Sequence, residues 1–417
     1  MLRSLKLGWF AFFLMALFLF PIKTFASDEV KVAFIRDHNL WMKVGTQEKQ
    51  LTRGEYVSYP KWSYDGQWIA YTKGQEEKEI GLYHVADQKH MEPFSGDGQN
   101  YQWAPDKNRL AFQSDGILKV MDVSKLKVGF ENVALGVDDY GWLPDGNGFI
   151  AATLANPTPM GWGSVELFTI PLDAKMNKEK MKHFYTLPKQ SDDFFAISAG
   201  YFKWSPDGKW VSFLGIPTAS WSADSNTLCV LSGDGKTFEI LDQMLLQENW
   251  MQWAPSKNLL AYIEGEGRFA MKDKHLKIKE LPVFQGGVFT PKGFVDWDFT
   301  WHNNQMITVA RAVESEWSND PKRRPLPVLY QVNIQSNKQE RITDPPKGFG
   351  DFNPIFLKQP NQLMWVRTNR ETSDVWIANP DGRKGKVWIK DLDTDIGYYE
   401  KRDWNAVLGV FSPAKSP

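Results

Sequence analysis

The chain has 417 residues, 42% of them hydrophobic and 14% aromatic, and its 49 basic and 50 acidic residues give a formal net charge of −1. This balance creates no overall field that would attract nucleic acid, so we expect no nucleic-acid partner. The single cysteine, Cys229, cannot form an internal disulfide, and its apolar surroundings in the sequence predict a buried, inert thiol.

The first 26 residues have the pattern of a secretory signal peptide. Arg3 and Lys6 precede an uncharged run over 7–22, and Ala26 offers a small residue for cleavage. An uncut membrane anchor is the alternative, although the run is short against the ~20 residues that span a bilayer. We therefore expect an exported protein, in the cell envelope or outside the cell. A single domain over 27–417, with no further membrane span, would remain.

A tryptophan followed by a turn recurs along the rest of the chain. The fullest copy, Trp204-Ser-Pro-Asp-Gly-Lys209, lies between two apolar runs, and its Pro, Asp and Gly favour a tight turn, which predicts a β-hairpin. Further copies begin at Trp62, Trp103, Trp142, Trp253 and Trp301, and weaker ones lie near Phe356 and Trp404. Intervals of 39 to 62 residues between such units are typical of a β-propeller.

Each repeat predicts four strands, A to D from the axis outward. In the repeat of Trp142 these are 139–142, 148–154, 165–170 and 183–187. The first strands, at 30–35, 40–44 and 49–52, fit B, C and D of a blade that lacks its A strand.

The C-terminal end offers the missing strand. Residues 398–404 fit an A strand, and apolar β structure follows at 406–411, so we expect the C-terminal strand to complete the N-terminal blade. The fold predicted is an all-β propeller of eight four-stranded blades. Seven blades are the alternative, if the terminal pieces only cap the ring.

The Trp-Ser-Pro-Asp-Gly-Lys motif at 204–209, followed by apolar β structure, resembles the repeat of TolB-like propellers, which are relatives of WD repeats. The same repeat occurs in the propeller of prolyl-oligopeptidase-type enzymes. Members of the TolB-like group are often exported proteins that bind other proteins. The resemblance therefore implies an exported protein-binding propeller.

Strand order determines which loops share a face. B–C and D–A loops lie on one face, here called face one, and A–B and C–D loops lie on the other, face two. Three long B–C insertions, 155–163, 216–225 and 313–327, should therefore meet on face one. The starts of the inner strands form a predicted binding rim around the channel there. Its members are Tyr59, Asn100, Asp139, Tyr201, Trp250, Asp298, Asn353 and Lys401. The alternative is that these residues only hydrate the channel.

No catalytic residue is assigned from the sequence, because it contains neither a Gly-x-Ser-x-Gly elbow nor a His-Glu-x-x-His motif. The carboxylate pairs Asp138/Asp139 and Asp296/Asp298 could serve acid–base chemistry at the channel mouth. No cofactor or metal is expected. A weak candidate for calcium is the alternating series Asp391, Asp393 and Asp395, for which a solvated acidic turn is the alternative.

The function predicted from these patterns is that of a monomeric, non-enzymatic scaffold, which presents face one to a protein partner or an envelope component. A closed ring holds its loops in fixed relation, so binding would cost little ordering entropy. The alternative is an enzyme, a hydrolase or lyase acting on peptide or carbohydrate within the central channel.

Overall fold

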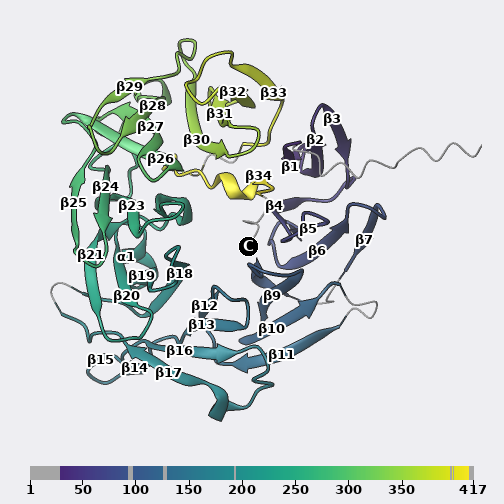
Figure 1. Cartoon of the computed structure of the whole chain (residues 1–417), viewed down its shortest axis with the longest axis vertical. Helices are drawn as coiled ribbons and strands as arrows, with labels where there is room; N and C mark the ends of the chain where they lie inside the picture. The colour runs from purple at the N-terminus through teal and green to yellow at the C-terminus, as the bar shows by residue number, and fades with distance from the viewer. Residues whose placement is uncertain are drawn as a thin grey trace, which may run out of the picture.

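A computed structural model describes residues 29–92, 97–124, 129–191, 194–394, 397 and 399–412. The predicted signal peptide lies outside this part of the chain. Eight four-stranded antiparallel sheets surround a central channel, which confirms the all-β fold and the count of eight blades (Figure 1). None of the helices in the described part of the chain is long and apolar enough to cross a membrane.

Each blade is given from its inner to its outer strand. Blades 1 to 4 are β34 (Leu408–Val410), β1 (Lys31–Arg36), β2 (Asn39–Val44), β3 (Gln47–Gln50); β4 (Val57–Trp62), β5 (Trp68–Lys73), β6 (Glu79–His84), β7 (Lys89–Met91); β8 (Gln99–Trp103), β9 (Arg109–Ser114), β10 (Ile117–Asp122), β11 (Phe130–Leu135); β12 (Asp139–Trp142), β13 (Gly148–Ala152), β16 (Glu166–Pro171), β17 (Lys182–Thr186). Blades 5 to 8 are β18 (Ser198–Trp204), β19 (Trp210–Ile216), β20 (Asn226–Ser232), β21 (Phe238–Met244); β22 (Met251–Trp253), β23 (Leu259–Glu264), β24 (His275–Glu280), β25 (Gln285–Val288); β26 (Phe294–Asn303), β27 (Met306–Val313), β28 (Val328–Asn333), β29 (Gln339–Arg341); β30 (Gly350–Leu357), β31 (Gln362–Thr368), β32 (Ser373–Ala378), β33 (Lys386–Ile389). Outside the blades lie the hairpin β14 (Pro157–Thr158) and β15 (Gly161–Trp162) and the short helices η1 (Lys178–Lys180), α1 (Ala219–Ser222), η2 (Glu248–Trp250), η3 (Pro321–Arg323) and η4 (Trp404–Ala406).

The ring closes because both chain ends contribute to blade 1, as predicted. β34 pairs antiparallel with β1, so that Leu408 lies opposite Phe34. The predicted inner strand at 398–404 is wrong, however. Residues 399–403 form no strand, and Tyr398 lies outside the described residues. The Asp403 carboxylate accepts the N–H of Asn405 at 3.0 Å and caps η4, which favours a helical turn here over extended structure.

The tryptophan of the repeat joins neighbouring blades. In five blades its indole N–H donates to a backbone carbonyl of the preceding blade's inner strand, at 2.9 to 3.2 Å, a contact that we call the indole bridge. The bridges run from Trp62 to Gly409, Trp103 to Lys61, Trp142 to Gln102, Trp253 to Lys203 and Trp301 to Gln252. Trp204 differs, because its buried Nε1 finds no acceptor among the described residues. The repeat seen in the sequence is therefore the device that orients one blade on the next.

Apolar side chains fill the spaces between blades. Tyr140, Phe149, Phe213 and Trp365 are among the largest that are fully buried. Cys229, in β20, is fully buried as expected, and burial raises the pKa of its thiol well above the ordinary value. The core therefore contains no reactive thiolate at neutral pH.

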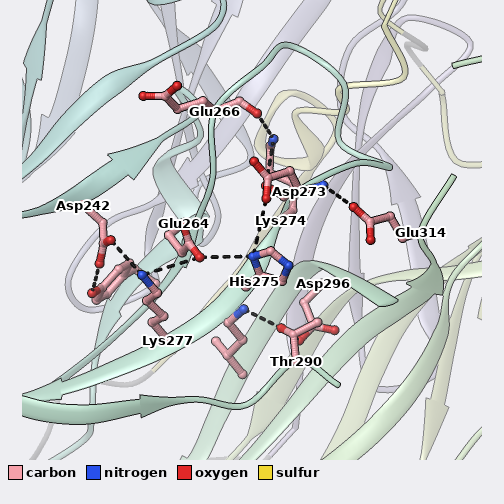
Figure 2. A network of polar contacts seen from close by, with 12 residues as sticks. Asp242, Glu264, Glu266, Asp273, Lys274, His275, Lys277, Thr290, Asp296 and Glu314 are labelled. Atoms are coloured by element: carbon pink, nitrogen blue, oxygen red, sulfur yellow. Dashed lines mark hydrogen bonds and ion pairs between the residues drawn. The ribbon is translucent and has the colours of Figure 1, made fainter. Parts of the chain in front are cut away.

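Polar contacts supplement this packing between blades 5 and 6. Asp242 of β21 accepts the Lys277 ammonium at 2.8 Å and the Tyr262 hydroxyl at 2.5 Å, both from blade 6 (Figure 2). Glu264 lies beside the same lysine and accepts from His275 at 3.1 Å. Because these groups satisfy one another between strands rather than in the channel, we assign them to the cohesion of the ring.

Residues 399–407, which we call the strap, lead from blade 8 to β34 across face one. Figure 1 shows its helix η4 near the centre of the ring. Lys401 donates to the Ala223 carbonyl at 2.9 Å, Arg268 donates to the Tyr399 hydroxyl at 3.4 Å, and Glu400 pairs with arginines of two further loops. These partners belong to the B–C loops of blades 5 to 8. The strap thus confirms that the insertions at 216–225 and 313–327 share one face.

The indole bridge predicts a difference between two tryptophans of the same motif. Trp142→Phe removes an N–H that donates to the Gln102 carbonyl at 3.2 Å, whereas Trp204→Phe removes one without an acceptor in the described structure. We expect Trp142→Phe to lower the free energy of unfolding by about 1 kcal/mol more than Trp204→Phe. Denaturant unfolding measures both variants, and equal losses would contradict the role of the bridge.

Candidate functional site in the central channel

The inner strands enclose a cavity of about 700 Å³ along the axis. Its wall comes from every blade except blade 4, and it includes Asn405 of the strap. The polar side chains in the wall include Lys61, Lys203, Glu248 and Gln252. A cavity of this size and polarity can hold a small ligand or a segment of a larger one.

In four blades the side chain of the residue that precedes the repeat tryptophan is used by the wall itself. Lys61 donates to the Tyr101 carbonyl at 3.1 Å, and Gln252 donates to the Phe299 carbonyl at 2.8 Å, in each case on the next blade's inner strand. Lys203 bonds the Met251 carbonyl in the same way, at 3.1 Å. These side chains therefore seal the channel wall, and binding or chemistry falls to other groups.

Four of the predicted rim residues lie in β-bulges. Tyr59, Asn100, Tyr201 and Asn353 have φ between 46° and 59°, in the left-handed region, and the strand pairing shifts beside each of them. Residues other than glycine rarely adopt this backbone conformation. Bulges redirect side chains, and they are frequent next to functional sites. The alternation of residues along the chain does not indicate these bulges.

Asp139, at the face-one end of β12, has an unusual environment for a carboxylate. Its Oδ1 accepts the Asn100 amide at 2.7 Å and the Tyr140 N–H at 2.6 Å. A Cβ at position 200 would lie only 1.9 Å from its Oδ2, so Gly200 allows the carboxylate to approach β18. Burial raises the pKa of Asp139 to about 7, against the lowering effect of the two hydrogen bonds. A carboxyl group that titrates near neutrality can act as acid or base.

Further ionisable groups surround this carboxylate. The charge of Glu248, which also borders the cavity, contributes to the raised pKa of Asp139 and of Asp403. Burial is the main cause of the raised pKa of Asp403, in the strap. The Asp403 carboxyl group is also hydrogen-bonded to the Tyr59 hydroxyl. Burial also raises the pKa of Tyr201 to about 12, so its hydroxyl stays protonated. The ring thus gathers three carboxyl groups and two tyrosines that lie far apart in the sequence.

Asp298, another predicted rim residue, is hydrogen-bonded to the rim residues Trp250 and Asn353, whereas Lys401 lies apart from them. Asp298 accepts the Trp250 indole N–H at 3.1 Å and the Asn353 backbone N–H at 3.0 Å, and burial raises its pKa. Lys401 does not begin an inner strand. Its ammonium is held on the Ala223 carbonyl within the loops of face one, and burial lowers its pKa.

The members of each predicted carboxylate pair have different hydrogen-bond partners, although the charge of Asp138 helps to raise the pKa of Asp139. Asp296 is fully buried and forms an ion pair with Arg311 at 2.6 Å, which leaves Asp298 alone at the channel. Asp138 accepts the Ser198 hydroxyl, whereas Asp139 bonds Asn100. The sequence names Asp139 as a rim residue, which stays a prediction, but it could not indicate that the charge of Glu248 acts on Asp139, because no spacing links the two.

The weak calcium candidate has a structural partner instead. The two oxygens of Asp393 accept the backbone N–H groups of Asp37 and His38 at 2.8 and 2.7 Å, across the seam between blades 8 and 1. The Asp391 N–H donates to Asp374 at 3.1 Å, and Asp395 lies outside the described residues. Within the described ranges no three histidine, cysteine or acidic side chains come together as metal ligands. Calcium binding here stays a prediction.

No protein-family model matches the sequence, and no curated protein matches it either. Solved structures do resemble the fold. One is the dihydro-heme d1 dehydrogenase NirN in complex with DHE, with a TM-score of 0.59, 12% identity, and coverage of 93% of this chain and 75% of that one. Another is dipeptidyl peptidase 4 of Porphyromonas gingivalis, with a TM-score of 0.57, 9% identity, and coverage of 87% of this chain and 58% of that one. A third is puromycin hydrolase, as its S511A mutant complexed with PGG, with a TM-score of 0.50, 12% identity, and coverage of 82% of this chain and 55% of that one.

These likenesses establish the fold. The chain spans about half the length of the puromycin hydrolases that it matches. The prediction of a non-enzymatic scaffold is wrong, because the solved structures that share this fold are mostly propeller-containing peptidases. The motif of the repeat misled the prediction, since the same motif serves binding proteins and enzymes alike.

The environment of Asp139 predicts how stability changes with pH. Its folded-state pKa of about 7 lies above its ordinary value of 3.8, so its stabilising contribution is complete below about pH 4 and is lost as pH rises through 7. Between pH 5 and pH 8 the wild type should lose at least about 1.4 kcal/mol more unfolding free energy than Asp139→Asn. Denaturant titrations at both pH values measure this. Asp173→Asn, at an exposed site, is the control, and identical pH dependence in all three proteins would contradict the assignment.

Proposed function

We propose that the chain is a hydrolase that acts on peptides, with its reacting group at Asp139 where the channel meets face one. The observation that carries this proposal is a closely surrounded carboxyl group with a pKa of about 7, which feels the charge of Glu248, a residue in the wall of the cavity of about 700 Å³. Buried acids with such values are concentrated at catalytic sites.

The chemistry requires a base, an acid and a donor to the developing oxyanion. Ionised Asp139 would take a proton from water as the water oxygen bonds to the peptide carbonyl carbon. The same carboxyl would then return that proton to the departing nitrogen as the C–N bond breaks. Tyr201 keeps its hydroxyl proton and can donate a hydrogen bond to the carbonyl oxygen, on which negative charge develops.

The choice of peptide over carbohydrate rests on the structurally similar proteins. The solved structures that resemble the fold of this chain include prolyl endopeptidases, dipeptidyl peptidases and puromycin hydrolase. They support the proposal without fixing a substrate, because the identities are only 9 to 14%. Two carboxylates across a channel also suit glycoside hydrolysis, so oligosaccharides belong in the test.

We further propose that the protein is exported and belongs among the TolB-like propellers. The basic start and the uncharged run over 7–22 support export, and the motif at 204–209 supports the family. N-terminal sequencing of the mature protein should begin at Ser27. A mature protein that retains residues 1–26 would contradict cleavage.

Activity should depend on Asp139. With a library of fluorogenic peptides, Asp139→Asn should lower kcat/KM for the best substrate at least about 100-fold, the usual contribution of a general acid–base group. The base must be ionised, so the wild-type kcat/KM should rise with pH and level off above an apparent pKa of about 7.

Asp173→Asn serves again as the matched control and should leave the rate unchanged. Full activity of Asp139→Asn would overturn the role of this residue. Cleavage of oligosaccharides and of no peptide would overturn the substrate class.

A further inference from the structure

A second cavity, of about 1040 Å³, opens on face one between the B–C loops of blades 7 and 8. We call it the arginine cavity. Five of its lining residues are basic: Lys322, Arg324, Arg341, Lys347 and Arg370. Only three are acidic, so the lining carries two positive charges in excess, although the whole chain has a net charge of −1. A concave surface of one sign concentrates ligands of the opposite sign.

The strap contributes the buried carboxylate of Glu400 to this cavity. The Nη1 of Arg324 lies 3.2 Å from its Oε1, and the Nε of Arg370 lies 2.5 Å from the same oxygen. A third guanidinium, that of Arg402, lies two residues further along the strap and is only 8% exposed. Its Nε and Nη1 find no acceptor in the described part of the chain. Buried charges are costly unless they are matched, and the two carboxylates that act on Arg402, Glu400 and Asp298, are fewer than the three guanidinium groups.

Two of the three arginines of the cavity, Arg324 and Arg370, are also held in position before any ligand arrives. The Arg324 Nε donates to the Ser318 carbonyl at 2.6 Å, and its guanidinium lies 3.8 Å from the centroid of the Trp317 ring. The Arg370 Nη2 donates to the Arg324 carbonyl at 3.1 Å. Fixed guanidinium groups bind carboxylates with little loss of entropy, because their forks match the two oxygens.

The cavity is linked to the channel site through the strap. Glu400 borders both the arginine cavity and a small cavity of about 20 Å³ that it shares with Arg402 and Asp298. Asp403, which is hydrogen-bonded to Tyr59 beside the channel, is three residues away along the same segment. A ligand bound at the arginines would therefore contact the strap, which also contributes Asn405 to the channel cavity.

We propose that the arginine cavity binds a carboxylate group of a peptide ligand, either an acidic side chain or the C-terminus. That the ligand is a peptide rests on the function proposed above, whereas its negative charge rests on the cavity alone. Lys322 and Lys347 have no ion-pair partner among the described residues, and they extend the positive surface toward the cavity opening.

Binding can be measured without turnover. A fluorescein-labelled peptide rich in Asp and Glu is titrated with the full chain and followed by anisotropy, beside the same peptide with Asn, Gln and an amidated C-terminus. We expect the acidic peptide to bind at least about fivefold more tightly, and this preference to shrink at high salt.

The double variant Lys322→Gln/Lys347→Gln removes two exposed charges without disturbing a buried pair. It should weaken binding of the acidic peptide at least about fivefold and leave the neutral peptide unaffected. Arg370→Gln should weaken it further, while Glu400 keeps its pairing with Arg324. Lys338→Gln, in the β28–β29 turn on face two, is the matched control and should change nothing.

Equal affinity for the acidic and neutral peptides, or no effect of the lysine variant, would overturn the proposal. Tighter binding of an oligouronate or of inorganic phosphate would overturn the assignment to peptide. Asp139→Asn should retain the preference for the acidic peptide. Binding of the acidic peptide by the wild type without cleavage of any peptide would refute the hydrolase and leave the carboxylate site standing.

Discussion

The structure depends on one hydrogen bond repeated around the ring, from a tryptophan indole to a carbonyl on the preceding blade. The carbonyl that accepts it belongs, in four of the five bridges, to the residue just before the preceding repeat tryptophan, as when Trp103 bonds Lys61. The side chain of that same lysine reaches forward to the Tyr101 carbonyl of the next blade. Where both contacts occur, as at β4, the inner strand is fixed from both sides, and the blades cannot slide past one another without breaking partly buried hydrogen bonds.

This constraint decides where function can lie. Side chains such as Lys61, Lys203 and Gln252 are already used by the wall of the channel. The polar side chains that the wall does not use lie where the regular strand pairing is interrupted, at the bulges of the inner strands, and on the strap. Asp139 beside Gly200, with Glu248 and Asp403 nearby, is the densest collection of such groups at the channel. The arginine cavity, which borders the strap at Glu400, has an excess of positive charge. Face one therefore has both an acidic region and a basic region.

The sequence could predict the fold because its signals are local. Trp204-Ser-Pro-Asp-Gly-Lys209 marks a hairpin by its own turn chemistry, and the repetition of that hairpin implies a ring. The strap at 399–407 could not be predicted, because its conformation depends on four loops that are distant in the sequence. The positive φ angles of Tyr59 and Tyr201 likewise have no local signal, since nothing but the strand pairing imposes them. Asp139 was predicted as a rim residue from its position alone, but its raised pKa arises chiefly from its burial in the folded ring, which the sequence does not show.

The pKa of Asp139 tests the account most directly. Carbon-13 NMR of the aspartate carboxyl groups, with Asp139 assigned by its loss in Asp139→Asn, follows this one group through the titration. We predict a midpoint near pH 7. A midpoint close to 4, the value of an ordinary aspartate, would contradict the proposed acid–base site at the channel.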